Sequence, residues 1–584
     1  MGLRGSFGPL DWLILVAILV GLTLLSRSLS RRQKTERDYF GGSRSLPWYA
    51  VAASLVATEI SAVTYISLPA IVHRPGGNLT YLQIGLFGYV AARLLVARFL
   101  VPAYYRYDVM SPYDLIERRL GDSGAAVRKM ATGLFWLGGV LAQSARVYLS
   151  AVVLGVLLHR ELAWLESATG LPPHVAAVAA VIGIAILWTW LGGIAAVVWT
   201  DAALFLLFLV GVAVSLGVVV WEIEAGISTT LGDAWTEGKF TLFDLSASLS
   251  TPYTLWAALI GASVGGFAAF GTDQLMAQRI FCCRNARDAQ RAVVASSVSV
   301  LVSFAFALVG IGLWAYYEQA PLQGVGAAMV AEQPDRVFAV FAVEAVTVGL
   351  KGLVVAGALA AAVSSLDSIL AALAQTTSSL LGTRVRGGDG LRLARLLVLG
   401  WGLVLGVTSL LMDEVAARYD ALLDLALAMA GYTGGALMAA VLMALAPCGR
   451  DGRGFLWSGP LSVLAVFAVA WHQPVAGWVC LLGGAVLFGT WLRSEGRARL
   501  GAGLLLFGGV ALVLALWRWA QGPAGELLAW PWYVPLGAAV AWLWGLGLSG
   551  RSAEPAVGRR VTLTPSAATG EGAGAPREAQ QGSC

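Results

Sequence analysis

Uninterrupted apolar stretches of about 20 residues recur along the chain and constrain its fold more than any other feature. The stretch AALFLLFLVGVAVSLGVVVW at 202–221 carries no charged side chain, whereas a helix that packs on a soluble core keeps a polar face. A helix of about 20 apolar residues spans the hydrocarbon core of a bilayer. The composition agrees, because 58% of the 584 residues are hydrophobic and only 12% are charged. We therefore expect an all-α integral membrane protein that crosses the bilayer many times.

The apolar stretches predict about fifteen membrane helices. They lie at about 10–26, 47–72, 79–102, 130–158, 174–191, 195–221, 252–278, 291–317, 345–374, 392–412, 420–446, 455–471, 474–492, 500–518 and 530–549. The helix boundaries are least distinct between Trp190 and Ala195 and among the last four helices, where the connections are short.

Basic residues are concentrated in alternate connections between these helices. One set of connections contains Arg27, Arg31, Arg32, Lys34, Arg37, Arg44, Arg106, Arg118, Arg119, Arg128, Lys129, Arg284, Arg287, Arg384, Arg386, Arg392, Arg493 and Arg497, and the other contains only the isolated Arg74, Arg160, Lys239, Arg336 and Arg418. Because cytoplasmic loops retain Lys and Arg, we predict an N-terminus outside and a C-terminus in the cytoplasm, in the plasma (inner) membrane. The net charge of +5 then follows from topology and indicates no nucleic-acid partner.

A stripe of hydroxyl side chains interrupts the apolar segment LAAAVSSLDSILAALA. On a helix, Ala361, Ser364, Ser365 and Ser368 fall within about a 100° arc, and Asp367 lies roughly 60° beyond its edge. Polar groups inside a membrane cost free energy, and they usually mark a pathway or a binding site. Close packing of small residues against a neighbouring helix is the alternative explanation.

A second polar cluster, formed by Thr58, Glu59, Ser61 and Thr64, lies in the apolar stretch SLVATEISAVTYISLP. If the helix is unwound between Ala57 and Ser61, its freed carbonyl groups become cation ligands, as in the discontinuous helices of transporters. These carbonyl groups and the hydroxyl stripe would together replace the hydration shell of a small hard cation.

A glycine-dense segment, GASVGGFAAFGTDQLMAQR at 261–279, predicts a second helix break. It lies five helices after the first, and two inverted repeats of five helices would place both breaks at the centre, where transporters bind substrate. A further segment, WTWLGGIAAVVWTD, ends with Thr200 and Asp201. Asp201 is either a site residue or a helix-start residue favoured by the helix dipole.

In this order and spacing, four segments resemble the sodium:solute symporter family. They are DYFGGSRSLPWYAVAASLVATEISAVTYISLPA (38–70), LGGIAAVVWTD (191–201), GTDQLMAQR (271–279) and AAAVSSLDSILAA (360–372). The resemblance covers about residues 10 to 450. It implies a LeuT-type fold with one leading helix, a core of five plus five helices in inverted repeats, and about four trailing helices.

The resemblance also implies two sodium sites, with sodium as the only expected cofactor. The main site uses backbone oxygens of the first and eighth core helices and two hydroxyls of the eighth. On this chain the matching residues are Ala57, Ile60, Ala361, Ser364 and Ser365. Some members hold a second sodium, and the matching residues are Asp201, Ser365, Ser368 and Asp367, where Asp367 replaces a hydroxyl of some relatives.

The sialic acid branch of the family supplies the expected substrate site. Ser61, Thr64 and Gln83 match its polar positions, and Arg146 lies where that branch binds a carboxylate. The alternative for Arg146 is a structural pair with Glu59 or with carbonyl groups.

Glu59, Phe267 and Phe270 complete the expected substrate site. The two phenylalanines flank Ala268 and Ala269, which stand where the sugar branch has an aromatic gate. This departure weakens a hexose as substrate.

We therefore expect sodium-coupled symport of a small polar organic solute that bears a carboxylate, such as sialic acid, by alternating access. Carriers of sugars or monocarboxylates are the alternatives within the family, and a membrane sensor or channel on the same fold is a more remote one. The expected partners are the sodium ion, the solute and the lipid bilayer. No enzyme activity is expected, because no metal cluster or Ser/His pairing converges on one helix face.

These expectations divide the chain into four regions. Residues 1–46 hold the leading helix and a cytoplasmic loop, 47–446 the ten-helix transport core, and 447–551 the additional membrane helices. The segment 552–584 is rich in Gly, Ala, Pro, Ser and Glu, which predicts a disordered cytoplasmic tail.

Overall fold

The computed structural model describes residues 7–30, 36–41, 44–224, 226–381, 389–417, 419, 421–446, 450–471, 474–493, 499–521 and 528–550. Within these residues the secondary structure is helical, and the only extended pairing is an isolated bridge between Leu46 and Cys283. The predicted tail and the predicted loop residues Arg31, Arg32, Lys34, Arg384, Arg386, Arg418 and Arg497 lie outside the described residues.

The helices of the first half of the chain are α1 (Pro9–Ser30), α2 (Glu36–Gly41), α3 (Trp48–Glu59), α4 (Ala62–His73), η2 (Ile84–Tyr89), α5 (Val90–Leu95), η3 (Val96–Leu100), α6 (Val101–Arg106), α7 (Pro112–Arg119), η4 (Gly121–Ser123), α8 (Gly124–Leu157), α9 (His159–Thr169), α10 (Pro173–Glu222), α11 (Ile227–Thr236), η5 (Ala257–Ala262), α12 (Ser263–Phe267), η6 (Ala268–Thr272) and α13 (Gln274–Ile280). Those of the second half are α14 (Ala286–Ala295), η7 (Ser296–Val298), α15 (Ser299–Gln319), α16 (Gly324–Glu332), η8 (Pro334–Arg336), α17 (Val337–Glu344), α18 (Leu350–Leu381), α19 (Asp389–Ser409), α20 (Asp413–Ala416), α21 (Leu422–Leu445), α22 (Phe455–Ala470), α23 (Pro474–Arg493), α24 (Arg499–Ala520), η9 (Trp530–Trp532) and α25 (Tyr533–Leu548).

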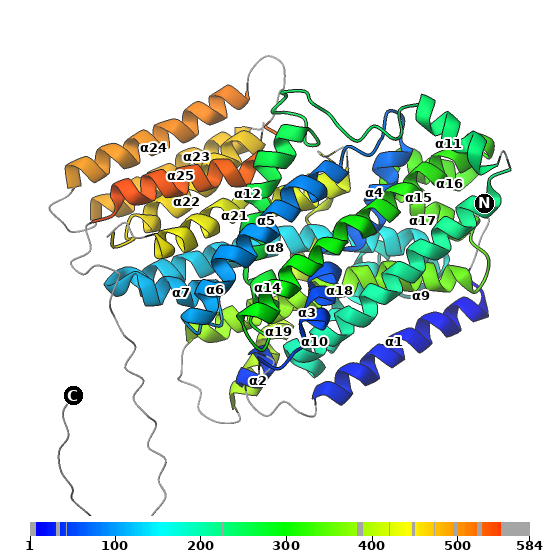
Figure 1. The fold of residues 1–584 in the computed structure, drawn as a ribbon, viewed down its shortest axis with the longest axis horizontal. Coiled ribbons are helices and arrows are strands. Elements are labelled where there is room, and N and C mark those ends of the chain that lie inside the picture. The colour runs from blue at the N-terminus through cyan, green and yellow to red at the C-terminus, as the bar shows by residue number, and fades with distance from the viewer. Residues whose placement is uncertain are drawn as a thin grey trace, which may run out of the picture.

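The helices form one bundle in which α1 and the group α22 to α25 lie at opposite edges (Figure 1). Between them lies α18, and each of its residues from Val354 to Ala374 is buried. The segment with the hydroxyl stripe is therefore the centre of the bundle, packed against α10, α8 and α19.

Every predicted membrane helix is found as helix, although fewer pass a strict length test. Within the described residues, ten helices are long and apolar enough to cross a bilayer, and the bent pair of α3 and α4 adds an eleventh. Helices in the 257–272 and 455–470 segments are apolar but shorter. The predicted span 345–374 is wrong at its start, because α18 begins at Leu350 after a turn. The short helices α2, α7, α9, α11 and α16 in the connections are not predicted by hydropathy.

Two helix breaks lie at the predicted positions in the two halves of the core. The first separates α3 from α4 at Ile60 and Ser61, where both residues are extended and the two helices meet at 57°. The second is at Asp273 (φ −83°, ψ 130°), between η6 and α13. This break lies inside the predicted segment 261–279, although the glycine-dense run before Asp273 is itself helical.

The long α10 consists of two membrane helices that meet at Gly193. Its 50 residues would extend about 75 Å as one helix, more than twice the hydrocarbon thickness of about 30 Å. Gly193 has φ 55° and ψ −175°, a backbone conformation open essentially only to glycine. The split expected between Trp190 and Ala195 is confirmed at this residue.

The connections gather at two opposite ends of the bundle. At the arginine-rich end, Arg44 pairs with Asp108 at 2.5 Å and the backbone N–H of Leu46 donates to the Cys282 carbonyl at 3.1 Å. At the other end, Asp424 at the start of α21 accepts hydrogen bonds from Tyr253 (2.6 Å) and Trp530 (2.8 Å). Loops far apart in sequence thus close each end separately, as the alternation of basic residues predicts.

Candidate functional site

The break between α3 and α4 lies beside the middle of α18. Ala57 is in the last turn of α3, where helix carbonyl groups have no partner within the helix. Its carbonyl oxygen lies 3.2 Å from the hydroxyl oxygen of Ser364. Ile60 follows with an extended backbone, so its carbonyl group belongs to neither helix. The structure thus brings residues of the expected main sodium site together across two helices.

Ala361 and Ser365 complete this set on α18. The Ser365 hydroxyl donates only a long bond of 3.4 Å to the Ala362 carbonyl, so its lone pairs are free for a cation. All five residues of the set are at most 1% exposed. Carbonyl and hydroxyl oxygens are the hard ligands that a small hard cation prefers. The residues present therefore fit a sodium ion.

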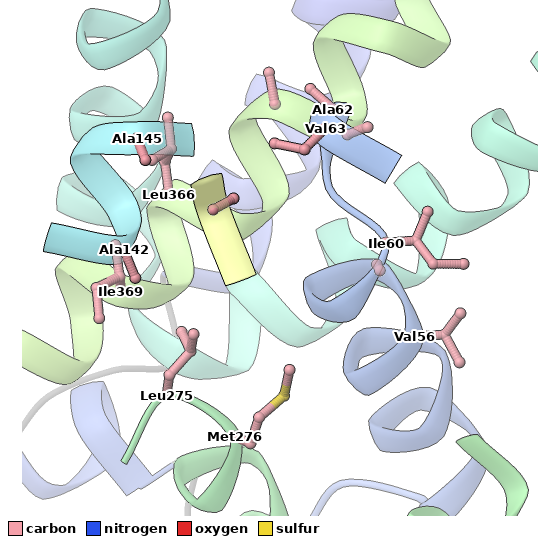
Figure 2. Close-up of a cluster of buried hydrophobic side chains, with 14 of the residues drawn as sticks. Val56, Ile60, Ala62, Val63, Ala142, Ala145, Leu275, Met276, Leu366 and Ile369 are labelled. Atoms are coloured by element: carbon pink, nitrogen blue, oxygen red, sulfur yellow. The ribbon is translucent and has the colours of Figure 1, made fainter. Parts of the chain in front are cut away.

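Apolar side chains enclose the break. Figure 2 shows Ile60 at the turn and, across the site, Leu366 and Ile369 of α18 close to Ala145 and Ala142 of α8. A low-dielectric surrounding strengthens every electrostatic interaction inside it. The same surrounding makes an unpaired polar group costly, which gives the free carbonyl groups a strong preference for a cation.

Asp201 on α10 lies directly behind the main set. Its Oδ1 accepts a 2.6 Å hydrogen bond from Ser364, and its Oδ2 accepts a 2.6 Å bond from Ser54 on α3. The side chain is completely buried. Asp201 thus bonds directly to one residue of the expected main sodium set, which favours a role in the site over a helix-start role.

A buried arginine that hydropathy does not mark, Arg279 on α13, completes this cluster. Its Nη2 donates to Asp201 at 3.0 Å and also to the Ser368 hydroxyl. Its Nε donates to Ser54 at 2.8 Å, and its Nη1 donates to the Leu275 carbonyl at 2.6 Å. Each of the three guanidinium nitrogens thus has at least one hydrogen-bond partner.

The residues expected for a second sodium lie close together, but protein groups already use their oxygens. Ser368 donates to Asp367 at 3.1 Å and accepts from Arg279, which also holds Asp201. Within the described residues the Ser365 hydroxyl bonds to Ala362 and to none of them, and it is Ser364 that bonds to Asp201. The second Asp367 oxygen is buried without a partner among the described residues. In this arrangement, the set does not fit a second sodium.

A separate ion pair, between Glu59 and Arg93, lies on the other side of the break. The Nη2 of Arg93 donates to Glu59 and, at 3.1 Å, to Ser299, while its Nε donates to Ser296 at 3.0 Å. The guanidinium carbon lies 4.1 Å from the centre of the Phe270 ring. Glu59 is thus bound to Arg93, and the structural pair of Glu59 with Arg146 that the sequence left open is wrong.

Arg146 on α8 lies half-buried beside these groups. Its Nε and Nη1 are shielded from solvent and have no partner among the described residues. Glu59 and Asp273 are close enough to act on its charge electrostatically, as are the phenol groups of Tyr81 and Tyr89. A guanidinium offers five donors and no acceptor, so this one has donors to spare for an anion.

The other expected substrate residues do not all lie together: Ser61 and Thr64 are on α4, and Phe267 lies apart from them. Ser61 begins α4 with no side-chain capping bond, and Thr64 lies one turn further on the same helix. Gln83 donates to the Tyr253 carbonyl at 2.9 Å, and its Oε1 is buried without a partner among the described residues. Phe267 instead packs in an apolar cluster with Met438 of α21 and Val534 and Ala538 of α25.

Arg93, Arg279 and Ser54 are the residues that sequence reasoning misses. Arg93 lies inside the predicted span 79–102, so its charge within an apolar run is a usable signal. The span predicted at 252–278 ends one residue before Arg279, so hydropathy does not mark this arginine as buried.

Comparison with known proteins places this geometry in a family. The model of the sodium:solute symporter family matches residues 39–459, and the chain therefore belongs to this family. Its core has the LeuT-type fold, in which two five-helix repeats each begin with a broken helix. The leading helix α1 and the trailing helices α23, α24 and α25 lie outside the matched residues.

Similar proteins include carriers of two kinds. The sodium/sialic acid symporter SiaT of Proteus mirabilis (strain HI4320) is 26% identical over 473 residues, which cover 79% of this chain and 90% of that protein. The sodium-coupled monocarboxylate transporter 1 of Homo sapiens is 26% identical over 446 residues, which cover 74% of this chain and 68% of that protein. A solved structure of a substrate-bound, outward-open Na+-coupled sialic acid symporter superposes with a TM-score of 0.70 at 20% identity, covering 92% of this chain and 97% of that chain. This likeness establishes the shared fold.

Proposed function

We propose that this protein uses a sodium gradient to carry a small hydroxylated carboxylate, such as a sialic acid, across the plasma membrane. The observation that carries the proposal is the Arg146 guanidinium, whose Nε and Nη1 are shielded from solvent and have no partner among the described residues. A buried charge without a partner is costly. An anionic substrate would supply the missing partner.

The chemistry of the pocket favours a carboxylate over a neutral solute. A carboxylate accepts two parallel hydrogen bonds from a guanidinium, and such charge-assisted bonds contribute about 1.5–3 kcal/mol each. Glu59 does not compete for Arg146, because Arg93 and Ser299 hold it.

The neighbouring polar groups favour a substrate that also carries hydroxyl groups. Gln83 Oε1 is an unused acceptor, and the Ser61 hydroxyl makes no capping bond. A hydroxylated acid can donate to the first and pair with the second. A plain monocarboxylate, the substrate class named for some relatives, would leave Gln83 Oε1 unpaired and is the second candidate.

The sodium gradient supplies the energy for transport. The ion would bind between the broken helix and α18. Ala57, Ile60, Ala361, Ser364 and Ser365 would hold it. Because two of these residues lie on the broken helix and three on α18, the ion favours the conformation in which those helices are close. Its release toward the low-sodium side lets them separate, which couples ion and solute movement.

The orientation of the chain in the membrane follows from the positions of the basic residues in its connections. The end of the bundle with Arg44 and Arg284 would face the cytoplasm and the end with Asp424 the outside, because basic loops stay inside. The N-terminus is then outside and the C-terminus inside. The ten-helix transport core would span 47–446, between the leading region 1–46 and the additional helices of 447–551. No covalent chemistry is assigned to it.

Uptake into proteoliposomes tests this function. We expect uptake of labelled sialic acid with an inward sodium gradient and none when choline replaces sodium. Arg146→Lys should weaken apparent affinity for the acid by about 10- to 100-fold, because Lys cannot form the paired bonds. Arg98→Lys, at an exposed position, is the control. Equal losses for sialic acid and for a neutral hexose in Arg146→Lys would contradict a carboxylate substrate.

A further inference from the structure

Arg279 occupies the space between the groups that a second cation would need. Its three guanidinium nitrogens bind four partners: Ser54, Leu275, Asp201 and Ser368. Two of these, Asp201 and Ser368, are among the four residues expected to hold a second sodium. Arg279 and Asp201 are both 0% exposed, so no solvent shares in the interaction.

The hydrogen-bond directions show how the oxygens are used. Oδ2 of Asp201 accepts from both Ser54 and Arg279, and Oδ1 accepts from Ser364. Ser368 accepts from Arg279 and gives its hydrogen to the Ser364 carbonyl at 2.6 Å or to Asp367 at 3.1 Å. A sodium ion would have to displace the guanidinium from these oxygens or lie against a like charge in a low-dielectric interior.

The same chain of bonds prepares the main sodium site. Ser364 has one hydroxyl hydrogen, and the 2.6 Å bond to the charged Asp201 takes it in preference to the 3.2 Å contact with the Ala57 carbonyl. The lone pairs of Ser364 and the Ala57 carbonyl are then both free for a cation. Arg279 in turn holds Asp201 in the position that orients Ser364.

We propose that Arg279 is a built-in cation that replaces the second sodium, so that this protein moves a single sodium ion with each substrate. The proposal rests on the proposed function. It assigns Arg279 as the residue that sets the ion-to-substrate ratio. Arg279 touches neither the substrate nor the main sodium ion, so it is a positioning residue.

Removing the charge of Arg279 should open the second site. In Arg279→Gln and Arg279→Met, Asp201 and Ser368 lose their cation, and Asp201 becomes a buried carboxylate beside free hydroxyl oxygens. A sodium ion then supplies the missing charge. We expect the number of sodium ions bound per purified protein, measured with radioactive sodium without substrate, to double relative to the wild type.

Three further measurements make the test specific. The ion-to-substrate ratio, measured from the voltage at which net uptake reverses, should rise in the same variants. Arg279→Met combined with Asp201→Asn and Asp367→Asn should return to the wild-type ratio, because neither carboxylate of the expected second site remains to attract the ion. Arg93→Met is the matched control, because it removes a buried arginine that bonds to no residue of the second site.

The outcomes separate this inference from the proposed function. Two sodium ions per substrate in the wild type would overturn the role of Arg279 and leave sodium-coupled symport intact. A single ion in both the wild type and the folded Arg279→Gln would also overturn it. Sodium-independent uptake by the wild type would instead overturn the proposed function.

Discussion

Two buried arginine–carboxylate pairs flank the break at Ile60, and they join different sets of helices. Arg93 connects α5 to Glu59 at the end of α3, to Ser296 of η7 and Ser299 at the start of α15, and to Phe270 on η6. Arg279 connects α13 to Asp201 on α10 and to Ser368 on α18.

The difference shows which contacts a transport cycle can change. The helices joined by Arg93 are the two broken ones and the helices beside them, α5 and α15, so the pair fits a unit that moves as one body. The pair of Arg279 and Asp201 crosses from a broken helix to the two helices that face the sodium site. In alternating access one body moves against another, so the Arg279 cluster lies where that motion takes place and the Arg93 cluster does not.

The strongest test of this contrast is Asp201→Asn. It leaves the Arg279 charge buried without a counter-charge, which should cost about 3–5 kcal/mol. It also removes the charged acceptor of Ser364, so the sodium concentration for half-maximal uptake should rise. Thermal unfolding in detergent, with and without sodium, measures both effects. The double variant Asp201→Asn, Arg279→Met should regain much of the stability, and no regain would mean that the pair is not an isolated unit.

Glu59→Gln should have a smaller and different effect. Glu59 is 17% exposed, and Arg93 keeps Ser296, Ser299 and the Phe270 ring as partners, so the expected loss is about 1–3 kcal/mol. The unfolding temperature should fall, while the sodium dependence of uptake stays as in the wild type. A changed sodium dependence would show that both pairs act on the ion and would break the comparison.

Ser365→Ala removes one oxygen from the main site without disturbing either pair. Its hydroxyl makes only a 3.4 Å bond to Ala362, so folding should be unaffected. The loss of one ligand should raise the half-maximal sodium concentration by about 10-fold, which corresponds to about 1.4 kcal/mol. Ser215→Ala, which removes a buried hydroxyl of α10 that binds Gly211, is the control. An unchanged sodium dependence in folded Ser365→Ala would remove this residue from the site.

Ser54→Ala should have the smallest effect. Ser54 donates to Asp201 and accepts from Arg279, but both charged groups keep each other as partners. We expect a loss of about 1 kcal/mol in stability and no change in the number of sodium ions bound. A second bound sodium in Ser54→Ala would show that Arg279 needs this hydroxyl to hold its place.

The sequence predicts those features of the fold that are formed by the same residues whose polarity or spacing marks them. The break at Ile60 follows from Glu59, Ser61 and Thr64 in an apolar run, and the joint near Gly193 follows from an apolar run too long for one membrane helix. In both cases the residues that mark the feature also form it.

The second break lies in the segment that its glycines mark, but not at the glycines themselves. Gly261 and Gly266 lie where a Cβ would meet Pro531 at 2.8 to 2.9 Å and Ala92 at 2.8 Å. These glycines allow helices to approach closely, and the break falls instead at Asp273, whose carboxylate accepts from the Leu275 N–H at 2.8 Å and starts α13. The partners of Arg93, Arg146 and Arg279 could not be predicted, because each pairing depends on helices brought together by the fold.

Gly193 has a consequence for how this sequence can diverge. Gly312 faces Val219, where an added Cβ would come within 2.3 Å of a valine methyl group, and a smaller neighbour can compensate for a change in that glycine. At Gly193 the obstacle is its own backbone, since φ 55° with ψ −175° strains any residue that has a Cβ. No mutation elsewhere relieves that strain unless it reshapes the joint itself. Gly193 should therefore stay fixed among descendants of this chain, while contact glycines such as Gly312 can change together with their neighbours.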